Sequence, residues 1–440
     1  MENQNQFLKE KPSRLFLSYL IPSISATLVT SIYILADTMM IGKGVGAVGI
    51  AALNLLLPIF SVYIGTGILF GVGGSVLFSV SKGRGEEEKA REYFTASVIL
   101  AVLASLLYMW IFTAFFDPIT LFLGRNKGTE QYVKEYGMYL KLTPAIFLFS
   151  SFLQAFVRND GAPKVSMAAV ITGGVVNVFL DYFFIFPLNM GIGGAAFATV
   201  LGYGLTTCIL CTHFFSRKNT LKLIRTEGLV RKCFDVVRHG FSSFLLEESN
   251  GIIMLLFNRQ LLSYVGDLGV VVYGIVSNSA LVVTSINNGI SQAAQPILAV
   301  NYGAGEKKRV ALAMKYGVIT AVLFGIGFTL IGLFFPEQIT SMFVNPTPEI
   351  MEMSTKAVRI YFLSFLPLGL NMLCSTYLQC VMKPGNAMAV CLLRGFILSS
   401  VLVVVLPVIW GVDGIWAVMA VTETVTLFAA VFFWRKAARG

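Results

Sequence analysis

Charged side chains are scarce in this sequence of 440 residues. Asp, Glu, Lys and Arg make up 13% of it, whereas hydrophobic residues make up 56%. Since a typical soluble domain has about 25% charged residues, this composition excludes a water-soluble protein. The chain also has only two histidines and six cysteines. The cysteines lie mostly in apolar segments, where a thiol acts as a small hydrophobic group, so no disulfide framework is expected.

Motifs for catalysis and for nucleotide hydrolysis are missing as well. The sequence contains no Walker A motif, no Ser/His/Asp grouping and no plausible metal triad. Cys208, Cys211 and His213 superficially resemble a zinc site, but they lie in an apolar segment without a fourth ligand nearby. We therefore expect neither an enzyme nor a cofactor, and energy for any active process has to come from an ion gradient.

Long uncharged runs are what the sequence has in abundance. A membrane-spanning helix needs about 20 mostly apolar residues, and the uncharged runs that meet this length are 15–36, 44–81, 93–116, 268–305, 316–336 and 360–382. Continuous runs favour helices over a β-barrel, whose strands read as alternating segments of roughly 10 residues. The pattern predicts an all-α polytopic membrane protein with twelve transmembrane helices, at 15–41, 49–81, 92–116, 132–157, 165–187, 192–215, 239–262, 268–302, 310–335, 351–381, 386–409 and 414–434.

The loops between these spans differ sharply in basic charge. The loops on one side, together with both ends of the chain, carry 25 Lys and Arg residues, against four in the loops on the other side. The positive-inside rule places the basic side in the cytoplasm, so both termini and the segment 217–238 are predicted to be cytoplasmic. This orientation and anionic lipid explain the net charge of +10, and nucleic-acid binding is not expected.

The sequence repeats itself at an offset of 220 residues. Residues 83–86 (GRGE) match residues 303–306 (GAGE), and Pro187 matches Pro407. Since each copy has an even number of helices, both copies face the same way, an arrangement found in alternating-access transporters. The chain is therefore predicted to consist of two pseudo-symmetric six-helix bundles, an N-lobe at 1–216 and a C-lobe at 239–440, joined by a cytoplasmic linker at 217–238.

One set of polar residues at membrane depth occurs in the first copy only. Three helices each carry two residues four apart, which lie on one helix face: Tyr33 and Asp37, Asn177 and Asp181, and Ala195 and Thr199. Carboxylate, amide, hydroxyl and carbonyl oxygens suit Na⁺, and carboxylates alone can carry H⁺, so the set is predicted to bind a cation. The alternatives are that Asp181 caps a helix near Pro187, or that Asp37 lies among lipid headgroups near Lys43.

Other residues within the spans have two readings each. Pro22 removes a backbone hydrogen bond in the first span, which predicts a bend there, although a static proline near the start of a membrane helix is as common. Glu247 and Glu248 in the seventh span either contribute to a substrate cavity or are satisfied locally, and which of them faces the cavity is open. Asn278 and Gln295 belong to an amide-rich stripe that lines the same cavity or joins neighbouring helices.

Motifs from both halves of the chain carry a family resemblance. They are residues 32–42 (IYILADTMMIG), 49–53 (GIAAL), 295–296 (QP) and 301–304 (NYGA). With these motifs the chain resembles the multidrug and toxic compound extrusion (MATE) family over nearly its whole length. NorM-like members place an acidic residue in the tenth helix, where this sequence offers Asn371, so the resemblance is closer to the DinF-like and MepA-like branches.

The resemblance implies twelve helices in two lobes around a central cleft, and export of organic cations in exchange for H⁺ or Na⁺. It also implies the ligands of a first-lobe cation site, because the family positions match Asp37, Asn177, Asp181, the carbonyl of Ala195, and Thr199, with Tyr33 and Pro22 matching as well. The predicted function is therefore a cation-coupled multidrug efflux antiporter that works by alternating access and exports organic, lipophilic cations.

Two alternatives to this function remain. A flippase for lipid-linked oligosaccharides would need a more cationic cavity than Arg259 and Arg394 provide, and a membrane receptor or enzyme would move no substrate. The expected partners are small organic cations or drugs and the lipid bilayer. The expected location is the plasma membrane (the cell inner membrane), and a monomer is expected. The sequence leaves the physiological substrate and the choice between Na⁺ and H⁺ open.

Overall fold

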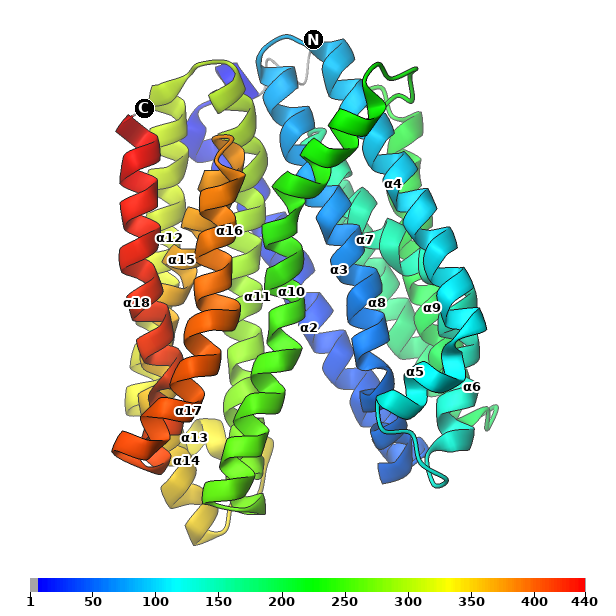
Figure 1. Ribbon diagram of the computed structural model, residues 1–440, viewed down its shortest axis with the longest axis vertical. Coiled ribbons are helices and arrows are strands. Elements are labelled where there is room, and N and C mark those ends of the chain that lie inside the picture. The colour runs from blue at the N-terminus through cyan, green and yellow to red at the C-terminus, as the bar shows by residue number, and fades with distance from the viewer. Residues whose placement is uncertain (1–6, 440) are drawn as a thin grey trace. The chain divides into compact units, whose positions relative to one another are not determined.

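The computed structural model describes residues 7–439 and is built from helices, with no strand in this range (Figure 1). The helices in chain order are α2 (Pro12–Gly44), α3 (Ala47–Gly83), α4 (Glu87–Ala114), α5 (Phe116–Phe122), α6 (Glu130–Leu142), α7 (Pro144–Asn159), α8 (Pro163–Ile185), α9 (Gly191–Cys211), η1 (Thr212–Phe215), α10 (Leu229–Tyr264), α11 (Asp267–Gly303), α12 (Lys307–Phe334), α13 (Pro336–Phe343), α14 (Pro348–Tyr361), η2 (Phe362–Ser364), α15 (Phe365–Cys380), α16 (Pro384–Leu392), η3 (Leu393–Ile397), α17 (Leu398–Trp410) and α18 (Val412–Arg439). The two chain ends, for which a cytoplasmic location is predicted, include residues 1–6 and 440, which lie outside the described residues.

Most of these helices are long and apolar enough to cross a membrane. Ten helical segments of the described chain meet this condition by themselves. An eleventh span is formed by α6 and α7, which are bent by 56° relative to each other at Thr143, the residue before Pro144. The residue before a proline disfavours helical backbone angles, which explains the break. The 36-residue α10 is long enough for the twelfth span, although side chains such as Glu247 and Glu248 reduce its apolar character.

The 220-residue repeat is visible in the helix boundaries. The starts of α3 and α11 lie 220 residues apart and both helices have 37 residues, while α4 and α12 have 28 residues each at the same offset. The turns match too, because three pairs of glycines at this offset have positive φ: Gly46 (89°) and Gly266 (76°), Gly85 (80°) and Gly305 (75°), and Gly191 (58°) and Gly411 (61°). A Cβ atom disfavours positive φ, so glycine is required at the same turns in both copies.

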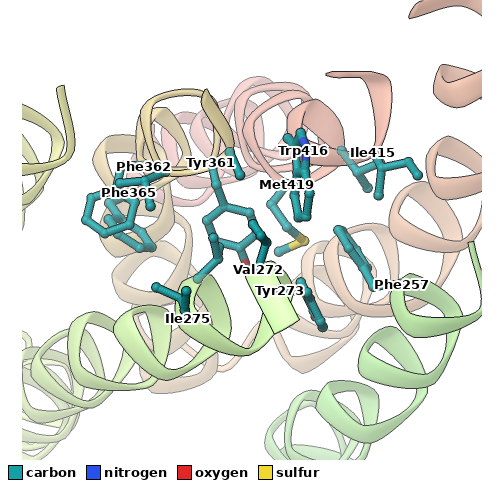
Figure 2. Packing of buried hydrophobic residues seen from close by; sticks show 14 of the residues in the cluster. Phe257, Val272, Tyr273, Ile275, Tyr361, Phe362, Phe365, Ile415, Trp416 and Met419 are labelled. Carbon is teal, nitrogen blue, oxygen red and sulfur yellow. The ribbon is translucent and has the colours of Figure 1, made fainter. Parts of the chain in front are cut away.

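The chain divides into two compact units. Unit 1 is formed mainly by Ile21–Phe244. Unit 2 is formed mainly by Leu245–Tyr302 and Glu306–Gly440, together with Lys11–Leu20, which includes the start of α2. Each unit has an apolar core of its own. In unit 2, Phe257 and Tyr273 stack with ring centroids 5.0 Å apart, and the buried Trp416 belongs to the same cluster (Figure 2).

A buried polar network lies in unit 1 where α7 ends. Asp160 is completely buried, and its carboxylate lies 2.7 Å from Lys82 Nζ and 2.9 Å from His213 Nε2. The backbone N–H of Thr220 donates to the same carboxylate at 2.8 Å. Burial by itself would raise the pKa of Asp160, but the hydrogen bond with His213 and the charge of Lys82 hold this pKa below its usual value. Since Thr220 lies in the basic segment 217–238, the network fixes part of this segment to unit 1.

Candidate cation-binding site

Two acidic side chains from different helices meet inside unit 1. Asp37 lies on α2 and Asp181 on α8, and their carboxyl groups face each other closely enough for their charges to interact. Asp181 is completely buried, and Asp37 is half-buried with its Oδ1 atom inside the protein. The two carboxyl groups lie within hydrogen-bonding reach of each other. Apart from this contact, Asp37 Oδ1 and both carboxylate oxygens of Asp181 lack a hydrogen-bond partner within residues 7–439, and neither side chain forms an ion pair.

Close packing of α8 against α9 sets the position of this part of α8. A Cβ atom at Gly202 of α9 would lie 2.7 Å from Asn177 Cβ and 3.0 Å from the carbonyl oxygen of Gly173, so a glycine is needed for the two helices to approach this far. Asn177 is buried, and its Nδ2 atom has no hydrogen-bond partner in the described chain. This contact fixes the position, relative to α9, of the face of α8 that carries Asn177 and, one turn later, Asp181.

The third predicted pair of residues lies on α9. Ala195 is completely buried and Thr199 nearly so. Thr199 Oγ1 donates a hydrogen bond of 3.0 Å to the carbonyl oxygen of Ala195, a bond that threonine commonly forms with the preceding turn of its own helix. A hydroxyl and a carbonyl oxygen therefore lie together on one face of α9.

Tyr33 connects α2 to the other two helices. Its hydroxyl donates to the hydroxyl of Tyr203 on α9 at 2.8 Å, and the two rings meet edge to face. Its ring also lies on Gly174 of α8, where a Cβ atom would come within 2.7 Å of Tyr33 Cδ1. Because Tyr33 precedes Asp37 by one helical turn, these contacts turn the Asp37 face of α2 toward α8 and α9.

Tyr136 on α6 belongs to the same group, although it was not among the residues predicted from the sequence. This residue is buried, its hydroxyl contacts the Thr199 side chain, and it lies near both Asp37 and Asp181. Through Tyr136, the hydroxyl of Thr199 and the two carboxyl groups form one cluster. The available signal was its position one turn from the buried Val133 and Leu140, which puts a polar hydroxyl on the buried face of the span.

The chemistry of this cluster suits a small hard cation. It combines two carboxyl groups with the oxygens of an amide, a threonine and two tyrosines, contributed by four helices. Oxygen donors of this kind bind Na⁺. Two adjacent buried carboxylates repel each other and cannot both stay charged without a counter-ion, so a shared proton would equally satisfy them. The buried oxygens without partners are the atoms that either cation would contact.

The match to a protein-family model falls into two parts, one in each copy of the 220-residue repeat. The MatE family model matches residues 22–183 and again residues 242–405, and the two matches begin 220 residues apart. The chain belongs to the MATE family. The resemblance inferred from residues 32–42 and from the motifs of the second half is thereby confirmed.

Relatives of this MATE chain match it from end to end. The multidrug export protein MepA of Staphylococcus haemolyticus is 26% identical, over 98% of this chain and 96% of its own length. The Staphylococcus aureus protein of the same name is 25% identical, over 97% of this chain and 94% of its own. Both agree with the MepA-like branch predicted from the sequence.

Solved structures have the same fold as this MATE chain. The outward-facing conformation of a multidrug resistance MATE family transporter of the MOP superfamily superimposes with a TM-score of 0.92 at 20% identity, over 99% of this chain and 97% of that one. A MOP superfamily transporter from Pyrococcus furiosus gives 0.90 at 21% identity, with coverage of 99% and 97%. The predicted fold of twelve helices in two bundles is confirmed.

The remaining predicted residues of this MATE chain lie apart from the cluster in sequence. Pro22 is buried inside α2, which runs as one helix from Pro12 to Gly44. Glu247 and Glu248 are half-buried on α10, and Asn278 is half-buried on α11. Gln295 is buried on α11, where its backbone carbonyl oxygen accepts a hydrogen bond from the Cys380 thiol at 3.4 Å. Their roles in bending and in substrate binding stay predictions.

Proposed function

We propose that this MATE-family chain is a cation-coupled antiporter that exports organic, lipophilic cations across the plasma membrane as a single chain. The observation that carries the proposal is the pair formed by the half-buried Asp37 and the buried Asp181, which face each other without a basic partner among residues 7–439. A pair of this kind needs a mobile counter-ion. The coupling ion is therefore H⁺ or Na⁺, held by Asp37, Asn177, Asp181, the carbonyl of Ala195, and Thr199.

Ion binding at this cluster would change the conformation because the ligands come from different helices. Neutralising the repulsion between Asp37 and Asp181 favours the conformation in which α2 lies against α8 and α9. The exported compound favours another conformation, so ion and compound compete, and the ion gradient drives export. With both termini in the cytoplasm, as the basic loops predict, the ion enters the cluster from the outer face.

The choice of exported compounds rests on the relatives and on one ion pair. The two curated relatives are named multidrug export proteins, which supports small organic substrates. Arg394, one of the main candidates for a basic residue at membrane depth, pairs with Glu423 in a buried salt bridge. A guanidinium held in this way does not supply a free positive charge for a lipid-linked oligosaccharide, which weighs against the flippase alternative.

The test is transport of ethidium-type dye into inverted membrane vesicles, where export from the cell appears as uptake, with Na⁺ and pH gradients imposed separately. Asp37→Asn and Asp181→Asn should each reduce gradient-driven transport to the level of vesicles without the protein, because the amides remove the charge that binds the ion. Asp117→Asn is the matched control, since Asp117 is an exposed carboxylate that pairs with Arg125. A wild-type rate in Asp181→Asn would contradict the proposal.

A further inference from the structure

Unit 2 contains a buried ion pair at membrane depth that takes no part in the ion exchange proposed above. Arg394 Nε donates a hydrogen bond to Glu423 Oε1, and Glu423 is completely buried. Asn371 Nδ2 on α15 donates to Glu423 Oε2 at 2.7 Å and to the backbone carbonyl of Glu423 at 2.8 Å. Both carboxylate oxygens of Glu423 therefore accept hydrogen bonds from nitrogen donors, whereas within residues 7–439 neither carboxylate oxygen of Asp181 in unit 1 does.

Arg394 reaches Glu423 from a π-helical turn. The turn η3 (Leu393–Ile397) lies between α16 and α17, and Ser399 Oγ donates to the carbonyl oxygen of Arg394. Turns of this type interrupt an α-helix at single positions and are frequent at functional sites. Arg394 is only 9% exposed, so the turn directs the guanidinium into the interior of unit 2.

The ion pair occupies repeat positions that in unit 1 border the candidate cation site. At the 220-residue offset, Glu423 corresponds to Tyr203 and Arg394 corresponds to Gly174. In unit 1 both of these residues contact Tyr33, through the hydroxyl of Tyr203 and through the ring that lies on Gly174. The first repeat thus places two carboxyl groups without a cation in this region, whereas the second repeat places a carboxylate with its own guanidinium.

We infer that Arg394 is the built-in cation of the second repeat and takes there the role that the exchangeable coupling ion has in the first. The inference rests on the proposed function, since it requires unit 1 to bind an ion. A guanidinium keeps its charge throughout the physiological pH range and is covalently part of the chain. Glu423 therefore stays neutralised during transport, and the chain has one exchangeable ion site rather than one in each repeat.

Removal of the guanidinium would leave oxygen donors around an unpaired carboxylate. Asn371 Oδ1 is buried and lacks a hydrogen-bond partner within residues 7–439, and the same holds for Thr422 Oγ1 and Thr426 Oγ1 within one turn of Glu423 on α18. Carboxylate, amide and hydroxyl oxygens are the donor types of the cluster in unit 1. An Arg394→Met variant would therefore acquire a second site for H⁺ or Na⁺ at Glu423.

Two other titratable groups lie near the pair, the Tyr361 hydroxyl on α14 and the Cys391 thiol on α16. Neither of them carries a positive charge in any protonation state. Neither can therefore replace Arg394 as the counter-ion of Glu423, and a new ion in Arg394→Met has to come from solution.

The experiment counts coupling ions bound by the purified, detergent-solubilised full chain. Radioactive ²²Na⁺ at alkaline pH measures Na⁺ sites, and proton release to an indicator dye measures H⁺ sites. Wild type should bind one ion per chain, Arg394→Met two, and the double variant Arg394→Met with Glu423→Gln one again. Arg394→Lys, which keeps the positive charge, should also bind one ion.

A further variant keeps the test decisive if Arg394→Met does not fold. Asp37→Asn combined with Asp181→Asn should bind no ion, because Glu423 is already neutralised by Arg394. An ion that remains in this variant and is lost on adding Glu423→Gln would overturn the inference, as would a single ion in folded Arg394→Met. If wild type binds no ion, the proposed function itself is wrong, and the inference is wrong with it.

Discussion

The hydroxyl of Thr199 is the smallest part of the candidate site that can be removed without changing its shape. We expect Thr199→Val to weaken binding of the coupling ion by about tenfold, because a lost hydrogen bond or ligand of this kind costs roughly 1–1.5 kcal/mol. The reason is that Thr199 Oγ1 contacts both the Ala195 carbonyl and Tyr136. The measurement is the ion concentration that gives half-maximal efflux.

Thr206 provides the matched control for this residue. It lies two turns further along α9, is also buried, and donates to the carbonyl oxygens of Gly202 and Ala169. Thr206→Val removes the same chemical group from the same helix but leaves the cluster intact. An equal loss of ion affinity in both variants would show that Thr199 acts through helix packing and not through the ion.

At the scale of residues, the sequence predicted partners on one helix better than partners on different helices. The four-residue spacing of Asn177 and Asp181 was enough to predict that they lie together, because the helical period places both on one face. The role of Tyr136 depends on which helix packs against which, and no local pattern carries this information. The pairing of Arg394 with Glu423 was missed for the same reason, since the two residues lie on separate helices.

At the scale of helices, the contact between α8 and α9 decides whether the cluster can form. We expect Gly202→Ala to destabilise the protein by about 1–3 kcal/mol, because the new methyl group would lie 2.7 Å from Asn177 Cβ and must push α8 away. The same displacement should reduce the rise in melting temperature that the coupling ion produces. Thermal unfolding in detergent, with and without the ion, measures both effects.

Gly204 is the control within the same helix. A Cβ atom at Gly204 has nothing within 4 Å, so Gly204→Ala adds the same group without a collision. It should leave both the melting temperature and the effect of the ion close to wild type, or raise stability slightly through higher helix propensity. If both variants behaved alike, the close approach at Gly202 would not be what holds the site.

The helices themselves were predicted well where hydrophobic runs are long and poorly where a span is interrupted. The starts of α3 and α11 follow from turn glycines at a fixed offset. The predicted span 132–157 gave no sign of the 56° bend between α6 and α7, because a proline in an apolar run fits both a kinked helix and a new helix start.

At the scale of the whole molecule, the two repeats have similar folds but different polar residues at membrane depth. The matching helix lengths and positive-φ glycines show that both copies share much of their backbone, whereas the turn η3 lies in the second copy where α8 of the first copy is continuous. At this offset Asp37, Asn177, Asp181 and Thr199 correspond to Phe257, Ile397, Val401 and Met419, so the second copy lacks the candidate cation ligands and instead pairs Arg394 with Glu423. The sequence offset shows which residues of the two copies correspond, but it does not show that Arg394 and Glu423 form an ion pair.

The orientation of the whole chain is a separate prediction that follows from its basic loops. In a variant without the six native cysteines, Lys127→Cys should react from outside intact cells with a membrane-impermeant maleimide, whereas Lys222→Cys should react only after the cells are opened. Both lysines are exposed, so a difference in labelling reports the side of the membrane and not burial. Labelling of Lys222→Cys in intact cells would reverse the orientation. The ion gradient would still drive export, but the coupling ion would then reach the Asp37 and Asp181 cluster through the face of the protein that carries the basic loops.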